Sequence, residues 1–129
     1  MSERARQNDM LLELGGREDT RLFRQNVGQA WVGKFVSLKN GRLILDNARP
    51  FHAGLCVGSS DLIGFRSVTL GGERTAVFCA IECKTPTGRA SAEQKAFVRT
   101  VLDHGGFAGF ARTPDEARAI LRIGGSDDE

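Results

Sequence analysis

The order of apolar and polar residues along the 129-residue chain predicts alternating helices and strands. Apolar residues recur at helical spacing in residues 2–14, after a capping serine and before a glycine pair, which predicts a first helix. Residues 21–31 alternate apolar and polar positions and predict a strand that leads into a glycine-containing loop. Residues 34–45 carry apolar segments on both sides of Asn40-Gly41, a dipeptide typical of tight hairpin turns. We therefore expect a small two-stranded hairpin there, followed by an irregular connection over residues 46–60.

The second half of the chain predicts a hairpin followed by a helix, a strand and a helix. Residues 61–70 and 75–84 are β-prone runs joined by the short connection GGER. Ser91 begins a helix, since a glutamine three residues later completes a capping box, and Gly105-Gly106 ends it. FAGFA predicts a short buried strand, and the sequence Thr-Pro-Asp-Glu begins a last helix that ends at Gly124-Gly125. This order predicts a mixed sheet flanked by helices, with a right-handed crossover from the 75–84 strand to FAGFA.

Composition indicates a single soluble globular domain outside the membrane. The chain is 40% hydrophobic and 26% charged, and no apolar run approaches the roughly 20 residues that cross a bilayer. The polar start SERARQND does not resemble a signal peptide. Three cysteines cannot all pair within one chain, and only two histidines accompany them, which argues against a structural zinc site. We expect reduced cysteines and a cytoplasmic protein.

Charge is distributed unevenly between the body of the chain and its end. The formal net charge is +2, from 18 Lys and Arg against 16 Asp and Glu. The terminal segment GGSDDE, residues 124–129, holds three of the acids, and we treat it as an acidic tail that follows a domain of residues 1–123. The domain is then more basic than the whole chain, which suits a polyanionic partner such as nucleic acid.

Two charged residues, Glu82 and Lys84, interrupt the apolar run CAIECK. Strand side chains alternate between faces, so both point to one face and the apolar residues around them to the other, which is expected to be core. A turn centred on Gly72-Glu73 would pair residues whose numbers sum to 145, which places Asp61 opposite Lys84. Asp61, Glu82 and Lys84 would then form one cluster, which a one-residue slip of the register would break.

This cluster has two readings. Two converging carboxylates bind a hard divalent cation such as Mg²⁺, and an adjacent ammonium suits a transition state that gains negative charge. Hydrolysis of a phosphodiester by metal-activated water is such a reaction. The other reading is a cross-strand salt bridge on a solvated face, worth less than about 1 kcal/mol. These three residues alone leave both readings open.

Four short motifs follow one another along the chain. They are GSSDLIG (58–64), AIECK (80–84), GRASAEQKAF (88–97) and HGGFAGFARTPDEA (104–117). Together they resemble the VRR-NUC domain, the virus-type replication-repair branch of the PD-(D/E)XK nucleases, over most of the chain. The segment with Arg24, Asn26 and Gly28 resembles the same family, with Gln25 where a second asparagine is common. The resemblance implies an α/β fold of the restriction-endonuclease type, with a mixed central β-sheet flanked by helices.

The resemblance also implies the roles of individual residues. Asp61 and Glu82 would hold Mg²⁺ or Mn²⁺, helped by the backbone carbonyl of Cys83. Lys84 would lie at the nucleophile. A glutamine on the helix after this strand is expected at the site, and Gln94 matches it, although the residue may be read as a helix cap alone.

The family further places an acidic residue in the first helix, for which Glu3 and Glu13 are the candidates. Family members tend to carry it about twelve residues before the glycine that ends the helix, and Gly15 then selects Glu3, acting on the metal directly or through water. Glu13 would instead lie on a solvated face. Four further residues are candidates for contacts to DNA phosphates, and the alternative for each is an ordinary surface residue: Arg24, Asn26, Arg89 and Lys95.

These expectations combine into one function. The resemblance implies a metal-dependent, structure-selective DNA endonuclease similar to Holliday-junction resolvases, in a bacterial or phage-infected cell. The alternative is a catalytically weak or inactive nuclease-fold module that binds DNA as an accessory. Two symmetric cuts in a junction require two sites, so we expect a homodimer, with the apolar hairpin 34–45 as the contact surface. The alternative is that this hairpin folds back onto its own domain.

Overall fold

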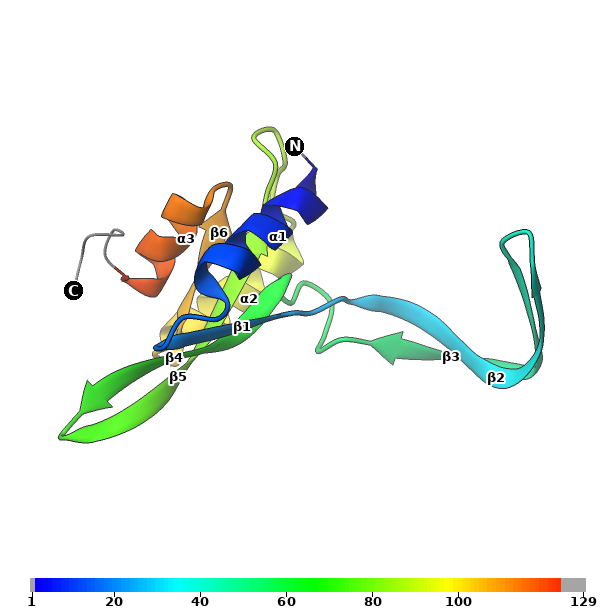
Figure 1. The fold of residues 1–129 in the computed structure, drawn as a ribbon, viewed down its shortest axis with the longest axis horizontal. Coiled ribbons are helices and arrows are strands. Elements are labelled where there is room, and N and C mark those ends of the chain that lie inside the picture. The colour runs from blue at the N-terminus through cyan, green and yellow to red at the C-terminus, as the bar shows by residue number, and fades with distance from the viewer. Residues whose placement is uncertain (1, 124–129) are drawn as a thin grey trace.

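The computed structural model of the protein describes residues 2–123 and is built around a four-stranded sheet. Its elements are α1 (Glu3–Leu14), β1 (Thr20–Arg24), β2 (Gly28–Lys39), β3 (Arg42–Ala53), β4 (Leu62–Leu70), β5 (Glu73–Cys83), α2 (Ala92–Asp103), β6 (Phe107–Ala111) and α3 (Pro114–Leu121). The strand order is β1-β4-β5-β6, in which only β5 and β6 are parallel (Figure 1). The predicted order of elements and the mixed sheet are therefore confirmed.

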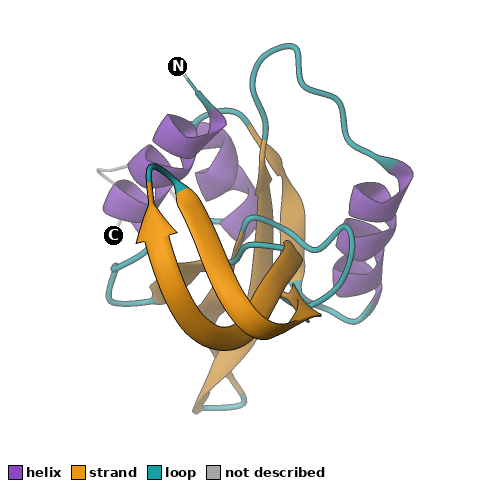
Figure 2. Ribbon diagram, turned by 90° about the vertical axis from the view of Figure 1, so that its right-hand side faces the viewer, coloured by secondary structure: helices purple, strands orange, loops and turns teal. Residues whose placement is uncertain are grey.

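Helices cover both faces of this sheet (Figure 2). On one face, Met10 of α1 and Leu121 of α3 pack against Ile81 of β5 in the larger core. On the other face, Val98 of α2 packs near Ala80, which is fully buried. The face of β5 that was expected to carry the charged residues is thus also a core for part of its length, because α2 covers it.

The β4–β5 hairpin turns at Gly71-Gly72 rather than at Gly72-Glu73, so paired residue numbers sum to 143. Both glycines of the turn have positive φ, 57° and 85°, as the tight turn requires of both central residues. The predicted pairing was therefore wrong by two positions, and the same register extended by one residue sets Asp61 opposite Glu82 rather than Lys84. Because a shift of two residues keeps every side chain on its face, the predicted cluster survives.

Strands β2 and β3 form a separate two-stranded sheet that extends away from the rest of the fold (Figure 1), and we call residues 28–53 the arm. The predicted turn is confirmed, since Asn40 and Gly41 both have positive φ, 52° and 75°. The predicted loop after β1 and the predicted irregular connection were partly wrong, because Gly28 pairs with Ala53 and the ladder continues from there to the turn. Pairing satisfies the backbone groups that each strand directs at the other, apart from two bulges in the ladder.

The ends of the helices follow their predicted signals with one exception. Ser2, Ser91 and Thr113 each cap a helix by accepting a hydrogen bond from the backbone three residues later. The last helix ends at Leu121, where Arg122 takes the left-handed conformation, and so it ends before the predicted Gly124-Gly125. Those glycines and the acidic tail lie outside the described residues. No helix within residues 2–123 has the length and apolar character that would let it cross a bilayer.

Candidate active site

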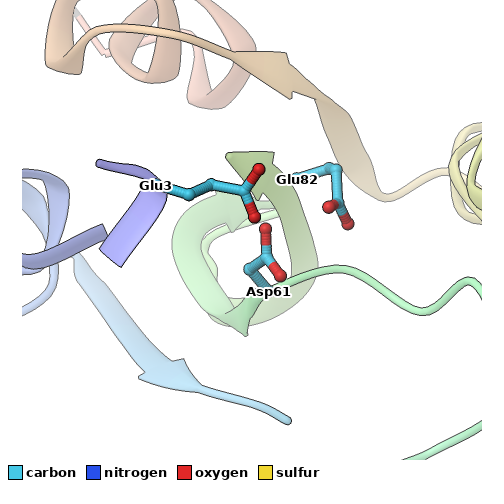
Figure 3. A group of neighbouring side chains, drawn as sticks. All are labelled: Glu3, Asp61 and Glu82. Atoms are coloured by element: carbon cyan, nitrogen blue, oxygen red, sulfur yellow. The ribbon is translucent and has the colours of Figure 1, made fainter. Parts of the chain in front are cut away.

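Three carboxylates from distant parts of the chain meet at one edge of the sheet. Glu3 lies in the first turn of α1, Asp61 directly precedes β4, and Glu82 is the second-last residue of β5. One oxygen of each lies within 4.8 Å of the others, and Figure 3 shows the side chains of Glu3 and Asp61 pointing toward each other beside Glu82. The structure therefore brings together the three acids that the sequence predicted.

Glu13, the other candidate of the first helix, lies elsewhere. Its carboxylate accepts a hydrogen bond of 2.7 Å from the guanidinium of Arg118 and so links α1 to α3. Ten residues separate it from Glu3, which is almost the whole length of the 12-residue helix. Among the two candidates, only Glu3 belongs to the acidic cluster.

Asp61 is held from both sides by backbone hydrogen bonds. Its Oδ2 accepts from the backbone N–H of Cys83 at 3.0 Å, which ties it to the end of β5. Its backbone carbonyl accepts from the N–H of Gln25 at 2.7 Å. These two bonds position the carboxylate on the sheet, and neither of them uses its second oxygen, Oδ1.

Glu82 is a buried acid with one unpartnered oxygen. The residue is only 2% exposed, and its Oε2 accepts from Gln94 Nε2 at 3.1 Å and lies 3.7 Å from Lys84 Nζ. Its Oε1 is buried and has no hydrogen-bond partner within residues 2–123. Burial, and next the neighbouring Asp61, raise the pKa of Glu82 to about 8, against the effect of Lys84. A cation at Oε1 would relieve this unfavourable position.

Lys84 and Gln94 form a pair at the same place. Lys84 Nζ donates to Gln94 Oε1 at 2.8 Å, and the lysine is only 7% exposed. The same oxygen accepts from the backbone N–H of Ser91 at 2.9 Å, which completes the capping box. Gln94 therefore both caps α2 and contacts Lys84 and Glu82, so the interpretation of Gln94 as a helix cap alone is wrong. The reading of Glu82 and Lys84 as a solvated salt bridge is also wrong, because both are buried.

A cleft of about 240 Å³ opens over the acids. Asp61, Glu82 and Gln94 form part of its lining, and the remainder comes from the two segments that connect the arm to the body. These are residues 25–27, before the arm, and Gly58 and Ser59, after it. The arm therefore begins at the rim of the site.

Gln25 is a residue whose structural role the sequence reasoning missed. Its Nε2 donates to the backbone carbonyl of Ser60 at 2.7 Å and to Ser59 Oγ at 3.0 Å, and its Oε1 accepts from the N–H of Leu55 at 2.8 Å. With its backbone bond to Asp61, it connects the acid to both ends of the arm. The signal available was the family pattern, which has another amide residue, asparagine, at this position.

The four residues expected to contact phosphates are placed differently. Asn26 lines the cleft. Arg89 and Lys95 line a neighbouring pocket of about 370 Å³, together with Lys84 and Arg112. The guanidinium of Arg24 instead donates to the side chains of two residues of α1, Gln7 and Asn8. Asn26 therefore lies beside the acids, Arg89 and Lys95 share a pocket with Lys84, and Arg24 is engaged with the first helix.

The two buried cysteines do not offer thiolate ligands. All three cysteines are unpaired, as expected, and Cys79 and Cys83 are buried. Burial raises the pKa of both thiols to about 12. Cys83 therefore remains neutral beside the acids, and its predicted contribution through the backbone carbonyl stays a prediction.

Comparison with known proteins adds one finding. The model of the family described as "VRR-NUC domain" matches residues 20–114 of the chain. This range contains Asp61, Glu82, Lys84 and Gln94 and begins after the first helix. Neither the curated proteins nor the solved structures contain a match to the chain.

Proposed function

The chain belongs to the VRR-NUC family of nucleases, and from this premise we propose that residues 1–123 form a metal-dependent DNA endonuclease of the PD-(D/E)XK type that selects branched DNA. The observation that carries the proposal is the meeting of three carboxylates within 4.8 Å of one another. A buried lysine and its glutamine partner lie directly beside them. An accessory module without activity would have no need of this complete set of groups.

Glu3, Asp61 and Glu82 are the proposed ligands of the cation, with the carbonyl of Cys83 as a further ligand and Glu3 acting directly or through water. Hard oxygen donors of this kind suit Mg²⁺ or Mn²⁺, and the unpartnered Oε1 of Glu82 supports a ligand at this position. When bound, the cation would lower the pKa of water and neutralise charge on the phosphate.

Lys84 supplies the second positive charge of the proposed mechanism. Its ammonium donates a hydrogen bond to Gln94 Oε1 at 2.8 Å, so the group is fixed before the substrate arrives. There it would orient the attacking water and offset the negative charge that develops on the phosphate oxygens. The attacking water loses a proton to solvent as its oxygen forms a bond to phosphorus, the bond to the deoxyribose oxygen breaks, and the released oxygen takes a proton from solvent.

A cleavage panel tests this function. The purified protein would be incubated with labelled four-way junction, flap and linear duplex, each with Mg²⁺, Mn²⁺ or a chelator. We expect cutting only with a divalent cation and faster cutting of branched DNA than of linear duplex. Equal cutting of all three substrates would contradict structure selectivity. Binding without cutting under every condition would support the accessory module instead.

Glu3→Gln and Glu13→Gln form a matched pair of variants on the same helix. We expect Glu3→Gln to lower the cleavage rate by about 10²-fold, because it removes a charge from the cation site. Glu13→Gln should leave the rate unchanged, since its partner is Arg118 and not the cluster. Single-turnover cleavage measures both, and circular dichroism checks the fold. The reverse ranking would move the first-helix ligand to Glu13.

We further propose that the protein acts as a homodimer whose contact surface is the arm. Large apolar side chains on the arm are exposed, and four of them share one face of its ladder: Trp31, Phe35, Leu38 and Leu43. A two-stranded hairpin is marginally stable alone, and a patch of this extent is typical of an interface. A two-fold dimer would also supply two active sites for the two strands of a junction.

The variant Leu38→Glu/Leu43→Glu tests the dimer, because both leucines are exposed on the same face of the arm. Light scattering at micromolar concentration should report about twice the chain mass for the wild type and the chain mass for the variant. The variant should also lose paired incision of junctions. Leu12→Glu/Leu70→Glu is the matched control, because both leucines are exposed, by 85% and 59%, outside the arm. A wild-type monomer that makes paired incisions would contradict the proposal.

A further inference from the structure

The two faces of the arm differ in chemistry. Directly opposed residues of a ladder share a face, and every second residue of a strand returns to it. In the outer part of the arm, three pairs share one face: Lys34–Asp46, Ser37–Ile44 and Lys39–Arg42. The pairs between them share the other face: Phe35–Leu45 and Leu38–Leu43. One face of the arm is therefore largely polar and the other is apolar.

The polar face carries most of the arm's charge. Arg49 pairs with Val32, which precedes Lys34 by two residues and so falls on the same face. Four cations, Lys34, Lys39, Arg42 and Arg49, accompany one acid, Asp46. All four are exposed, and none takes part in an ion pair within the described part of the chain. We call these four residues the cationic face.

A groove of about 510 Å³ on the arm is lined by Trp31, Leu43, Ile44, Leu45 and Ala48. Trp31, Leu43 and Leu45 belong to the apolar face, whereas Ile44 pairs with Ser37 on the polar face. At Gly33 the strands approach so closely that a Cβ would lie 2.8 Å from the carbonyl oxygen of Asp46. Figure 2 shows the bend of the paired strands. The cationic face lies on the opposite side of the two-stranded ribbon from most of the groove's lining.

The position of the arm relative to the cleft is also defined. Both of its connections to the body line the cleft, and Gln25 links them to each other and to Asp61. A polyanion that occupies the cleft must therefore lie next to the base of the arm. The cationic face extends from Arg49, which pairs with Val32, to Lys39 and Arg42, which pair beside the turn at the far end of the arm.

We infer that the cationic face binds duplex DNA that extends from the cleft along the arm, through its phosphate backbone. The inference rests on the proposed nuclease function for the presence of DNA in the cleft. Clustered cations bind duplex by displacing condensed counterions, and a two-stranded β-ribbon has the size to enter a major groove. The apolar face remains available for the second copy of the chain, so one arm serves both contacts.

Lys39→Gln/Arg42→Gln tests the inference at the outer end of the arm. Binding to a labelled junction would be measured by fluorescence anisotropy at several salt concentrations, in an Asp61→Asn background that does not cut. Each phosphate contact contributes about 0.9 to the slope of log K against log[salt], so the variant should lower the slope by about 1.8. Its affinity should fall by at least about tenfold at low salt.

Arg74→Gln/Arg122→Gln is the matched control, since it removes two exposed arginines of β5 and of the end of α3, outside the arm. It should keep the parent slope, and both variants should keep the parent mass in light scattering. An unchanged slope in Lys39→Gln/Arg42→Gln would overturn the inference, and so would a loss of dimer mass in that variant. Cleavage is measured separately, with protein that keeps Asp61. If this protein does not cut DNA but Lys39→Gln/Arg42→Gln still lowers the salt slope of binding, the proposed nuclease function is refuted and the arm remains a DNA contact.

Discussion

Asp61→Asn and Glu82→Gln are expected to lower DNA cleavage by at least about 10³-fold, which corresponds to about 4 kcal/mol of the barrier. Each change removes a negative charge from the proposed cation site and hardly alters side-chain volume. Oxygen ligation of Mg²⁺ depends on these charges, and without the cation neither water nor phosphate is activated. Single-turnover cleavage of a junction, with wild-type protein purified in parallel, measures the loss. Near-normal cleavage by either variant would contradict the assigned site.

Thermal unfolding without cations separates loss of chemistry from loss of fold. The pKa of Glu82 is raised from 4.5 in the unfolded chain to about 8 in the fold. Between these values the folded state keeps a proton that the unfolded state has released, so stability falls as pH rises through this window. Glu82→Gln cannot ionise, and it should unfold at a higher temperature than the wild type at pH 8, with little difference at pH 4.5. Each kcal/mol of relief corresponds to about 4 °C.

Added Mg²⁺ should narrow that difference at pH 8. The wild type gains stability because the cation binds the folded state, whereas Glu82→Gln lacks a ligand and gains less. A variant that is less stable than the wild type without cations at pH 8 would contradict the strained position of Glu82. Equal stabilisation of both proteins by Mg²⁺ would place the cation elsewhere.

Lys84→Met is expected to lower the cleavage rate by about 10²-fold at saturating DNA, because it removes a fixed charge that acts on the transition state. Methionine has a comparable length and suits the burial of this position, where Lys84 is only 7% exposed. The three carboxylates remain, so Mn²⁺ binding measured by calorimetry should be retained or strengthened. Arg74→Gln, which removes a charge from the start of β5, is the control for a general loss of DNA affinity.

Two outcomes would contradict the proposed role of Lys84. Cleavage at the wild-type rate would show that its ammonium takes no part in the reaction. Loss of Mn²⁺ binding in parallel with cleavage would show that the lysine acts only by maintaining the cation site. The expected result separates the two roles, since the rate falls while the cation stays bound.

Local sequence signals predicted the elements and most of the site. Caps and paired glycines act within a few residues, so the helix starts at Ser91 and Thr113 and the turn at Asn40-Gly41 could be read directly. To predict that Asp61 and Glu82 cluster, it was enough to assign each strand residue to the correct face of the sheet. The error of two residues in the register left those faces unchanged.

Features that depend on distant contacts could not be predicted from the residues alone. Glu3 lies 58 residues before Asp61 in sequence. It reaches the site because α1 packs on the sheet through Met10 and Leu14. The arm is longer than predicted because residues 28–32 form strand pairs with residues 49–53, which lie in the stretch that was predicted to be irregular. Gln25 has an ordinary position in sequence, and its importance follows only from its bonds to the returning segment at Leu55 and beyond.

Anomalous diffraction from crystals soaked in Mn²⁺ tests the assigned cation site, because it locates the cation without reference to activity. We expect a peak within coordination distance of the carboxylates of Asp61 and Glu82, with Glu3 bound directly or through one water. The same soak of Glu82→Gln crystals should give a weaker peak or none. A wild-type protein that cuts DNA with Mn²⁺ but shows its peak away from these three acids would contradict the account.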